Sequence, residues 1–359
     1  MPTPATTPNS GTGSQASPQA ARRDPAGPDP LVQATWPIRT REHVDLWLHS
    51  YALLTRDTTL VPYFRRDYRT RINEVRQKKN AASLIDTDRA KLLARIAVEP
   101  SILTAGQFLP LYFSNWTEMK QAIEVFVRND GNPGSISDPA TRQYFAILGG
   151  AFSSAADREW LRLFTAAADD ESKRFYHDYW MAESRAHSVA QGHIDTLWQK
   201  TWRPALQRFL NNTQQQNGEL YLSLPLGGEG RTVQFGKAQN AIAIEFPDSP
   251  ADAEAALYVI AHEIAGPIAS QALADNTTPA DQRTGANSRY EQAAAVRAGA
   301  LLLQRTVPGA VFGYMRFYLQ AAGYPVPNDP QAAFNSVFGL PTPVRDAIVR
   351  QLEVVLGGI

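Results

Sequence analysis

The hydrophobic pattern of the chain changes its period near residue 218. From Trp36 to about Asn212, apolar residues recur at spacings of three and four, which is typical of amphipathic helices; the segment REHVDLWLHSYALL at 41–54 is one example. In GELYLSLPL, at 218–226, leucines alternate with other residues, as in a half-buried strand. The change predicts an α+β protein that is predominantly α-helical.

The change in period also divides the chain into parts. We expect a helical domain over 36–215 and a second domain over 216–359 with a small three-stranded sheet. Residues 1–35 are rich in Pro, Thr, Ser and Gly and contain few large apolar side chains. Such a segment buries too little surface to offset the entropy of ordering it, so we expect a disordered leader.

Three runs account for the predicted sheet. GELYLSLPL and RTVQF both alternate, and the glycine-rich stretch GGEG lies between them, so we expect these two runs to form a hairpin with GGEG as its turn. NAIAIEF is the third strand. GGEG has no lysine and no helix directly after it, so the sequence does not indicate a phosphate-binding loop there.

A helix is predicted directly after the sheet. Ser249 fits its N-cap, Pro250 its first position and Asp252 a capping-box acid. Gly266 followed by Pro267 predicts the end of this helix, because glycine accepts the left-handed C-terminal position and the residue before proline avoids the α region.

This helix contains His262 and Glu263, the first half of the H-E-x-x-H pattern of zinc peptidases. In that pattern two histidines four residues apart bind zinc from one side of the helix, and the glutamate takes a proton from the water that the metal activates. Gly266 occupies the position of the second histidine.

A small sheet, a His-Glu helix and a further helix, NSRYEQAAAVRAGALLLQR, follow in that order. This order resembles the gluzincin-type metallopeptidases, the thermolysin-like and M1 aminopeptidase-like group, in degenerate form. The resemblance implies a zincin-like domain, a zinc cofactor and hydrolysis of peptide bonds. It assigns His262 and Glu291 as metal ligands, Glu263 as the general base, and Tyr314 or Tyr318 as the donor to the oxyanion.

The sequence departs from the gluzincin pattern at two positions. Gly266 leaves the metal one ligand short, and Ala295 stands where many thermolysin-like members have an aspartate. The alternative is therefore a noncatalytic protein of the same fold, which binds a peptide or protein partner in the cleft between the domains. In that case His262, Glu263 and Glu291 form a hydrogen-bonded polar cluster.

The other histidines show no ligand spacing. His187 and His193 are six residues apart, as are His43 and His49, so neither pair shares a helix face. Glu183 and His187 share a face but lack the Glu-x-x-His spacing of dimetal bundles, and His177 lies among aromatic residues. We expect structural roles for all of them.

The composition restricts the partners. Lys plus Arg and Asp plus Glu number 35 each, so no overall field favours nucleic acid or an anionic membrane, and a peptide or protein partner is expected. Cysteine is absent, which excludes thiolate chemistry and disulfides. No apolar run is long enough to span a membrane. The leader resembles a tether left after export, so we expect a bacterial protein that is periplasmic or secreted.

Overall fold

The computed structural model describes residues 36–235, 239–278, 283 and 285–357. The expected leader over 1–35 lies outside the described residues. The chain divides into two compact units, 1–32 and 33–359, and every described residue belongs to the second. Most of these residues lie in helices around one small mixed sheet, which confirms the predominantly helical α+β prediction.

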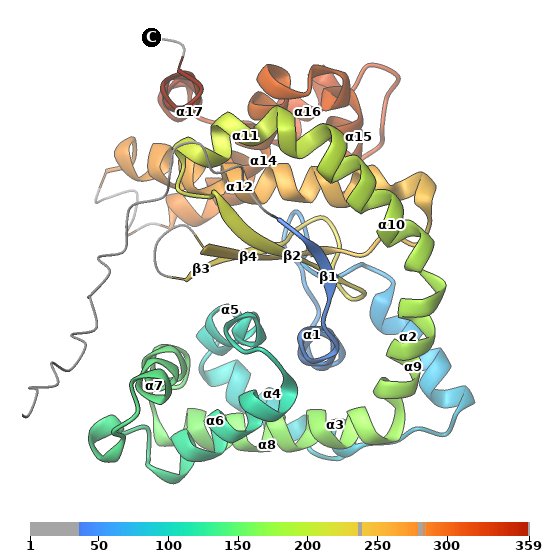
Figure 1. The fold of residues 1–359 in the computed structure, drawn as a ribbon, viewed down its shortest axis with the longest axis vertical. Helices are drawn as coiled ribbons and strands as arrows, with labels where there is room; N and C mark the ends of the chain where they lie inside the picture. Colours follow the sequence, from blue (N-terminus) through green and yellow to red (C-terminus); the bar gives the residue numbers. More distant parts are fainter. Residues whose placement is uncertain (1–35, 236–238, 279–282, 284, 358–359) are drawn as a thin grey trace, which may run out of the picture. The chain divides into compact units, whose positions relative to one another are not determined.

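The sheet has four strands in the order β1-β2-β4-β3 (Figure 1). β1 is parallel to β2, β2 is parallel to β4, and β3 is antiparallel to β4. The prediction of three strands was wrong, because the short β1 pairs with β2 from far away in the sequence and is too short to show a period. The strands are β1 (Ile38–Thr40), β2 (Asn217–Ser223), β3 (Arg231–Phe235) and β4 (Gln239–Glu245).

The predicted hairpin between the first two runs was also wrong. β4 lies between β2 and β3, so β3 forms its antiparallel pair with β4 and not with β2. β2 and β4 are the central strands, and most of their residues are buried whichever face they point to, as expected for parallel strands covered on both sides. Residues 224–230 are consequently a buried loop and not an exposed turn.

Helices cover both faces of this sheet (Figure 1). On one face lie α12 and α14, with α15 to α17 beyond them. On the other face lie α1 and the helices α3 to α8. A nearly continuous run of helix over α8 to α11, with π-helical turns at η3 (Ser172–Tyr176) and η4 (Trp198–Trp202), connects the two layers.

The helices of the N-terminal region are α1 (Glu42–Leu54), α2 (Tyr68–Lys78), α3 (Leu84–Thr87), α4 (Arg89–Val98), α5 (Ser101–Gly106), α6 (Trp116–Arg128), α7 (Pro139–Ala151), α8 (Ala155–Glu171), α9 (His177–Ala186), α10 (Ser188–Leu197) and α11 (Arg203–Asn212). Those after the sheet are α12 (Ala253–Asp275), α14 (Ala286–Thr306), α15 (Val311–Ala321), α16 (Gln331–Val337) and α17 (Thr342–Val355). Short 3-10 turns are η1 (Leu109–Tyr112), η2 (Pro133–Ser135), η5 (Pro250–Asp252) and η6 (Pro308–Ala310).

α12 does not end at Gly266, as the sequence predicted, but continues through Pro267 to Asp275. The ring of Pro267 lies on an exposed side of the helix, while Ile268 and Leu273 beyond it are buried. α12 packs along α14 over much of its length. The packing of its second half therefore outweighs the local cost of proline in a helix.

Within the described residues no single helix is long and apolar enough to cross a membrane. The segments Arg89–Val98 and Ser101–Tyr112 pass such a test only as a pair and are bent by 110°.

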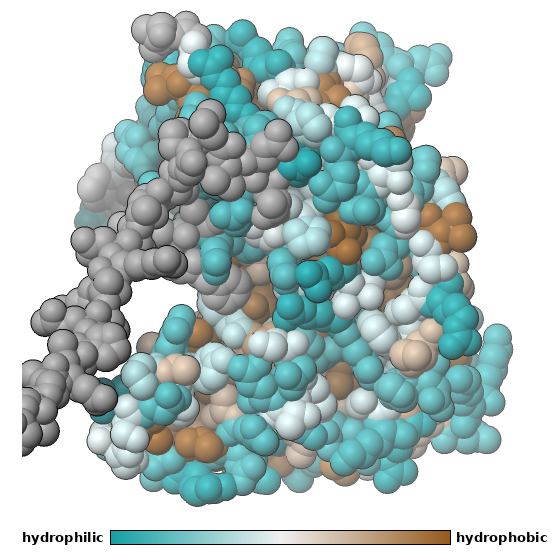
Figure 2. All heavy atoms as spheres, viewed as in Figure 1, coloured by the Kyte–Doolittle hydropathy of each residue, from teal (hydrophilic) through white to brown (hydrophobic). Residues whose placement is uncertain are grey.

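On the face drawn in Figure 2, hydrophobic side chains are scattered among hydrophilic ones.

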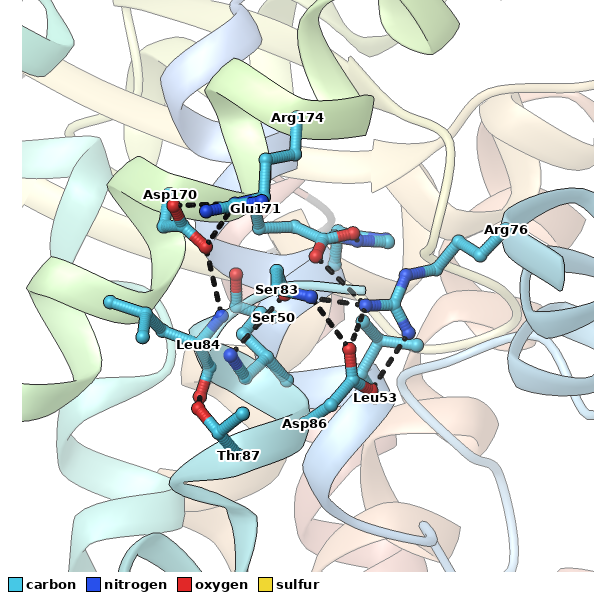
Figure 3. A network of polar contacts seen from close by, with 12 residues as sticks. Ser50, Leu53, Arg76, Ser83, Leu84, Asp86, Thr87, Asp170, Glu171 and Arg174 are labelled. Carbon is cyan, nitrogen blue, oxygen red and sulfur yellow. Dashed lines mark hydrogen bonds and ion pairs between the residues drawn. The ribbon is translucent and has the colours of Figure 1, made fainter. Parts of the chain in front are cut away.

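A buried ionic network holds the helical layer together (Figure 3). Arg76 on α2 donates through Nη2 to Glu171 Oε2 at 3.0 Å and to Asp86 Oδ2 at 2.6 Å. His49 Nε2 lies 3.2 Å from Glu171 Oε1, and both side chains are fully buried. Glu171 thus connects α1, α2 and the end of α8.

Asp45, a second buried acid on α1, predicts a pH-dependent stability. Its Oδ2 accepts a hydrogen bond from Trp180 Nε1 at 2.8 Å. Burial raises its pKa to about 7 from the ordinary 3.8, although the nearby Ser223 hydroxyl and the hydrogen bond from Trp180 oppose the increase. The unfolded chain therefore releases this proton near pH 4, whereas the folded chain keeps it to about pH 7, so stability decreases across that range.

Asp45→Asn removes the titrating group and keeps an acceptor for Trp180. Its free energy of unfolding relative to wild type is expected to increase by about 2–4 kcal/mol between pH 4 and pH 7.5 and to stay constant above that, given about 1.36 kcal/mol per unit of pKa shift. Urea titrations at several pH values measure the difference. Parallel stability curves for the two proteins would contradict the assignment.

Candidate metal centre

The buried loop between β2 and β3 delivers Glu229 to the interior. A Cβ on Gly228 would lie 2.8 Å from Ala321 Cβ, and a Cβ on Gly230 would lie 2.6 Å from the carbonyl oxygen of Ala243. Both positions therefore require glycine for the close approach of the loop to α15 and β4. The two glycines allow the loop to turn the Glu229 carboxylate toward α12.

The middle of α12 supplies the other two members of the site. His262 and Glu263 are both buried there. On the neighbouring α14, a Cβ on Gly299 would lie 3.2 Å from His262 Cα and would overlap the Tyr314 hydroxyl group. Glycine at 299 thus lets α14 pack directly against α12 at the level of His262.

Glu229, His262 and Glu263 form one cluster, in which a donor atom from each residue lies within 4.8 Å of the others. His262 Nδ1 lies 3.1 Å from Glu263 Oε1, and Glu263 Oε2 accepts a hydrogen bond from Thr232 Oγ1 at 2.9 Å. His262 Nε2 faces Glu229 Oε2 at 3.8 Å. That distance is too long for a hydrogen bond.

Two atoms of the Glu229–His262–Glu263 cluster are buried without a hydrogen-bond partner among the described residues: His262 Nε2 and Glu229 Oε2. The contact with Glu263 is satisfied by the imidazole tautomer that has its proton on Nδ1, which leaves the Nε2 lone pair directed toward Glu229. In metal sites, the ring nitrogen of a histidine that does not bind the metal usually donates its hydrogen to a carboxylate, as Nδ1 does here to Glu263. The two facing atoms are therefore available as ligands.

The charges of the cluster are coupled. Burial raises the pKa of Glu229 to about 7, and the charge of Glu263 adds to this while His262 opposes it. For His262, burial favours the neutral ring, but the nearby charge of Glu229 and the hydrogen bond with Glu263 outweigh it and raise the pKa. Burial would also raise the pKa of Glu263, yet the contact with His262 lowers it. Two carboxylates in this interior require a compensating positive charge, which either a proton on His262 or a bound cation would supply.

Of the other predicted residues, Glu291 lies outside the cluster, Tyr314 is hydrogen-bonded elsewhere, and Tyr318 lies against His262. Glu291 lies on α14 with an exposed side chain and is outside the cluster found among the described residues. Tyr314 donates its hydroxyl hydrogen to the carbonyl oxygen of Val296 at 2.9 Å. The Tyr318 ring stacks on His262 with centroids 5.5 Å apart, so it fixes the imidazole plane.

Gly266 faces open space. Apart from its chain neighbours and the backbone of its own helix, no described atom lies within 4 Å of a Cβ built on this half-buried glycine. Among the described residues, no side chain next to position 266 therefore takes the place of the second histidine of the zinc-peptidase pattern.

Glu229 was missed by the sequence analysis, which assigned GGEG to an exposed turn. The sequence feature that could have pointed to Glu229 is that it is the one acid among the glycines of GGEG, directly before a strand. Its interpretation depends on knowing that β4 separates β2 from β3, which local patterns do not reveal.

Two half-buried residues flank the cluster. Arg231 donates from Nη2 to the Tyr63 hydroxyl at 3.0 Å, and its guanidinium lies 5.5 Å from the centroids of the Tyr63 and Phe108 rings. The charge of Arg231 opposes the burial-driven rise in the pKa of Glu229 and adds to the effect of His262 in lowering the pKa of Glu263. These two side chains supply hydrogen-bond donors next to the carboxylates.

Of the five remaining histidines, all predicted to be structural, four have hydrogen-bond partners. These are His43 with the carbonyl oxygens of Pro110 and Phe113, His49 with Tyr68 and Glu171, His177 with Glu42, and His187 with Asp248 and the carbonyl oxygen of Glu183. His193 is exposed.

Comparisons with protein-family models, with curated proteins and with solved structures give no match for this chain.

Proposed function

We propose that this protein is a divergent zincin-type metallohydrolase of the gluzincin kind, built on a zinc-class metal site at the Glu229–His262–Glu263 cluster. The observation that supports it is the pair of facing, buried and unpartnered ligand atoms, His262 Nε2 and Glu229 Oε2. The expected substrates are peptides or proteins.

The donor set fits a zinc-class ion. Imidazole nitrogen and carboxylate oxygen bind zinc at about 2.0–2.2 Å, so two such atoms 3.8 Å apart are close enough to share one ion at an obtuse angle. A carboxylate oxygen of Glu263 lies within reach of the same ion, but its role in this proposal is that of the proton acceptor. The charge of the ion would balance the two buried carboxylates, which otherwise depend on a proton.

The roles of the chain's own residues follow from their contacts. A bound ion would supply Lewis-acid activation of water. Glu263 orients His262 through Nδ1 and, with Thr232 on its other oxygen, is held beside the reaction site as a proton acceptor. Arg231 and Tyr63 are the donors placed to bind the carbonyl oxygen of a peptide substrate, in the role that the sequence assigned to Tyr314 or Tyr318.

A second candidate, a noncatalytic protein that binds a peptide or protein partner, is favoured by two observations. Glu291 is exposed, so the expected third ligand is not at the cluster. Both oxygens of Glu263 are already hydrogen-bonded, which leaves it less free to act as a base.

Hydrolysis of a fluorogenic peptide mixture by the zinc-loaded protein separates the two candidates. The hydrolase predicts turnover that is lost in Glu229→Gln and in Glu263→Gln but kept in Glu291→Gln, a matched change outside the cluster. Zinc binding by wild type without any turnover would reject the hydrolase and leave the binding protein.

A further inference from the structure

A strongly basic segment lies within this otherwise neutral chain. Residues 56–79 contain eight arginines and lysines but only three acidic residues, while the chain as a whole has 35 of each. The segment comprises the connection between α1 and α2 and all of α2. Such a local excess of positive charge requires either internal partners or an anionic ligand.

A hollow of about 630 Å³ lies on this segment. Four arginines line it, Arg56, Arg65, Arg66 and Arg69, against two acids, Asp57 and Glu74. The volume is within the range of small-molecule pockets, about 300–1,000 Å³.

The structure compensates only part of this charge. Arg65 is neutralised, because it pairs with Asp248 at 2.7 Å and with Glu245 at 3.2 Å. Arg66 donates to the carbonyl oxygen of Ala321 at 2.9 Å, which fixes its position without cancelling its charge. Arg56 and Arg69 have no carboxylate within ion-pair distance in the described part of the chain.

One of the two acids that line the hollow, Asp57, has both oxygens hydrogen-bonded. Asp57 Oδ1 accepts hydrogen bonds from Thr59, and Asp57 Oδ2 accepts one from the main-chain nitrogen of Tyr63 at 2.6 Å. The local field also reaches Arg89, whose pKa is lowered mainly by burial and then by the charge of Arg69. The hydrogen bonds fix Asp57 without cancelling its charge, so the three arginines that have no ion pair among the described residues face the two carboxylates of the hollow, and one positive charge is left in excess there.

We propose that this hollow binds a small molecule through a phosphate or diphosphate group. Guanidinium groups bind phosphate oxygens in bidentate pairs, and Arg66, Arg56 and Arg69 surround one volume in which such pairs can form. Thr55, Thr70 and Asn73 line the same hollow and add neutral hydrogen-bonding groups. The site is separate from the Glu229–His262–Glu263 cluster and does not depend on metal binding there.

Calorimetric titration of the full chain with inorganic pyrophosphate tests this inference. We expect saturable binding that Arg56→Gln/Arg69→Gln weakens by about 10- to 100-fold, the size of one charge-assisted hydrogen bond. The control is Lys78→Gln/Lys79→Gln, which removes the same charge from α2 outside the hollow and is expected to change the affinity less than about threefold. His262→Ala is expected to bind pyrophosphate like wild type.

Three results would overturn the proposal. They are the absence of saturable binding by wild type, an equal loss in the two double variants, and a loss in His262→Ala, which would place the ligand at the metal cluster. Citrate is the comparison for carboxylate chemistry, and citrate that binds as tightly as pyrophosphate would also reject the assignment to phosphate. Each double variant is expected to fold, because the replaced side chains lie at or near the surface. Circular dichroism of each variant checks this.

Discussion

Gly266→His is expected to increase the affinity of the protein for zinc by about 10²–10³-fold. Four protein ligands bind structural zinc with about 10–16 kcal/mol, so one ligand contributes on the order of 2.5–4 kcal/mol. Position 266 lies one helical turn after His262, and helix side chains lean toward the N-terminus, so a histidine there would lie over the His262 turn. The open space around Gly266 accommodates the ring.

The matched control is Gly266→Ala. It has the same backbone consequences, including the strain of a non-glycine residue before Pro267, but adds no ligand. Competition with a chelating dye measures zinc affinity in both variants and in wild type. If Gly266→His binds zinc no more tightly than Gly266→Ala, position 266 does not face the Glu229–His262–Glu263 cluster.

Glu171→Ala is expected to decrease the free energy of unfolding by about 3–5 kcal/mol, because it removes the fully buried carboxylate that contacts both Arg76 and His49. Arg76 and His49 both contact this carboxylate in the interior (Figure 3). His49 is fully buried and, among the described residues, keeps only its hydrogen-bond contact with the Tyr68 hydroxyl. Arg76 keeps its ion pair with Asp86. Urea unfolding at constant pH measures the change.

The control for Glu171→Ala is Glu159→Ala on the same helix. Glu159 pairs with Arg162 at 2.6 Å, but both side chains are about half exposed, so the loss is expected to stay below about 1 kcal/mol. Similar losses at the two positions would show that the Glu171 network contributes no more than a surface pair.

The predominantly helical character could be predicted from the sequence, because long helices repeat their apolar positions every three or four residues. The runs that form β2, β3 and β4 also showed their alternation. The order of these strands in the sheet could not be predicted, because the pattern of a run shows which of its residues are buried but not which strand lies beside it. β1 has three residues and depends entirely on its pairing with β2.

The candidate site was predicted in part for the same reason. His262 and Glu263 belong to a recognisable local pattern, and the structure brings them together with a buried carboxylate. Glu229 comes from a loop whose burial results from strand order, and Glu291 from a helix whose orientation places it in solvent. The end of α12 was misjudged because Gly266 and Pro267 signal a stop locally, whereas packing against α14 continues the helix.

The most direct test of the metal centre is the zinc content of purified protein, measured by mass spectrometry after incubation with zinc and gel filtration. We predict stoichiometric zinc in wild type and in Glu291→Gln, and its loss in both His262→Ala and Glu229→Gln. Wild-type protein without zinc would contradict the metal centre. So would zinc that remains in His262→Ala and Glu229→Gln.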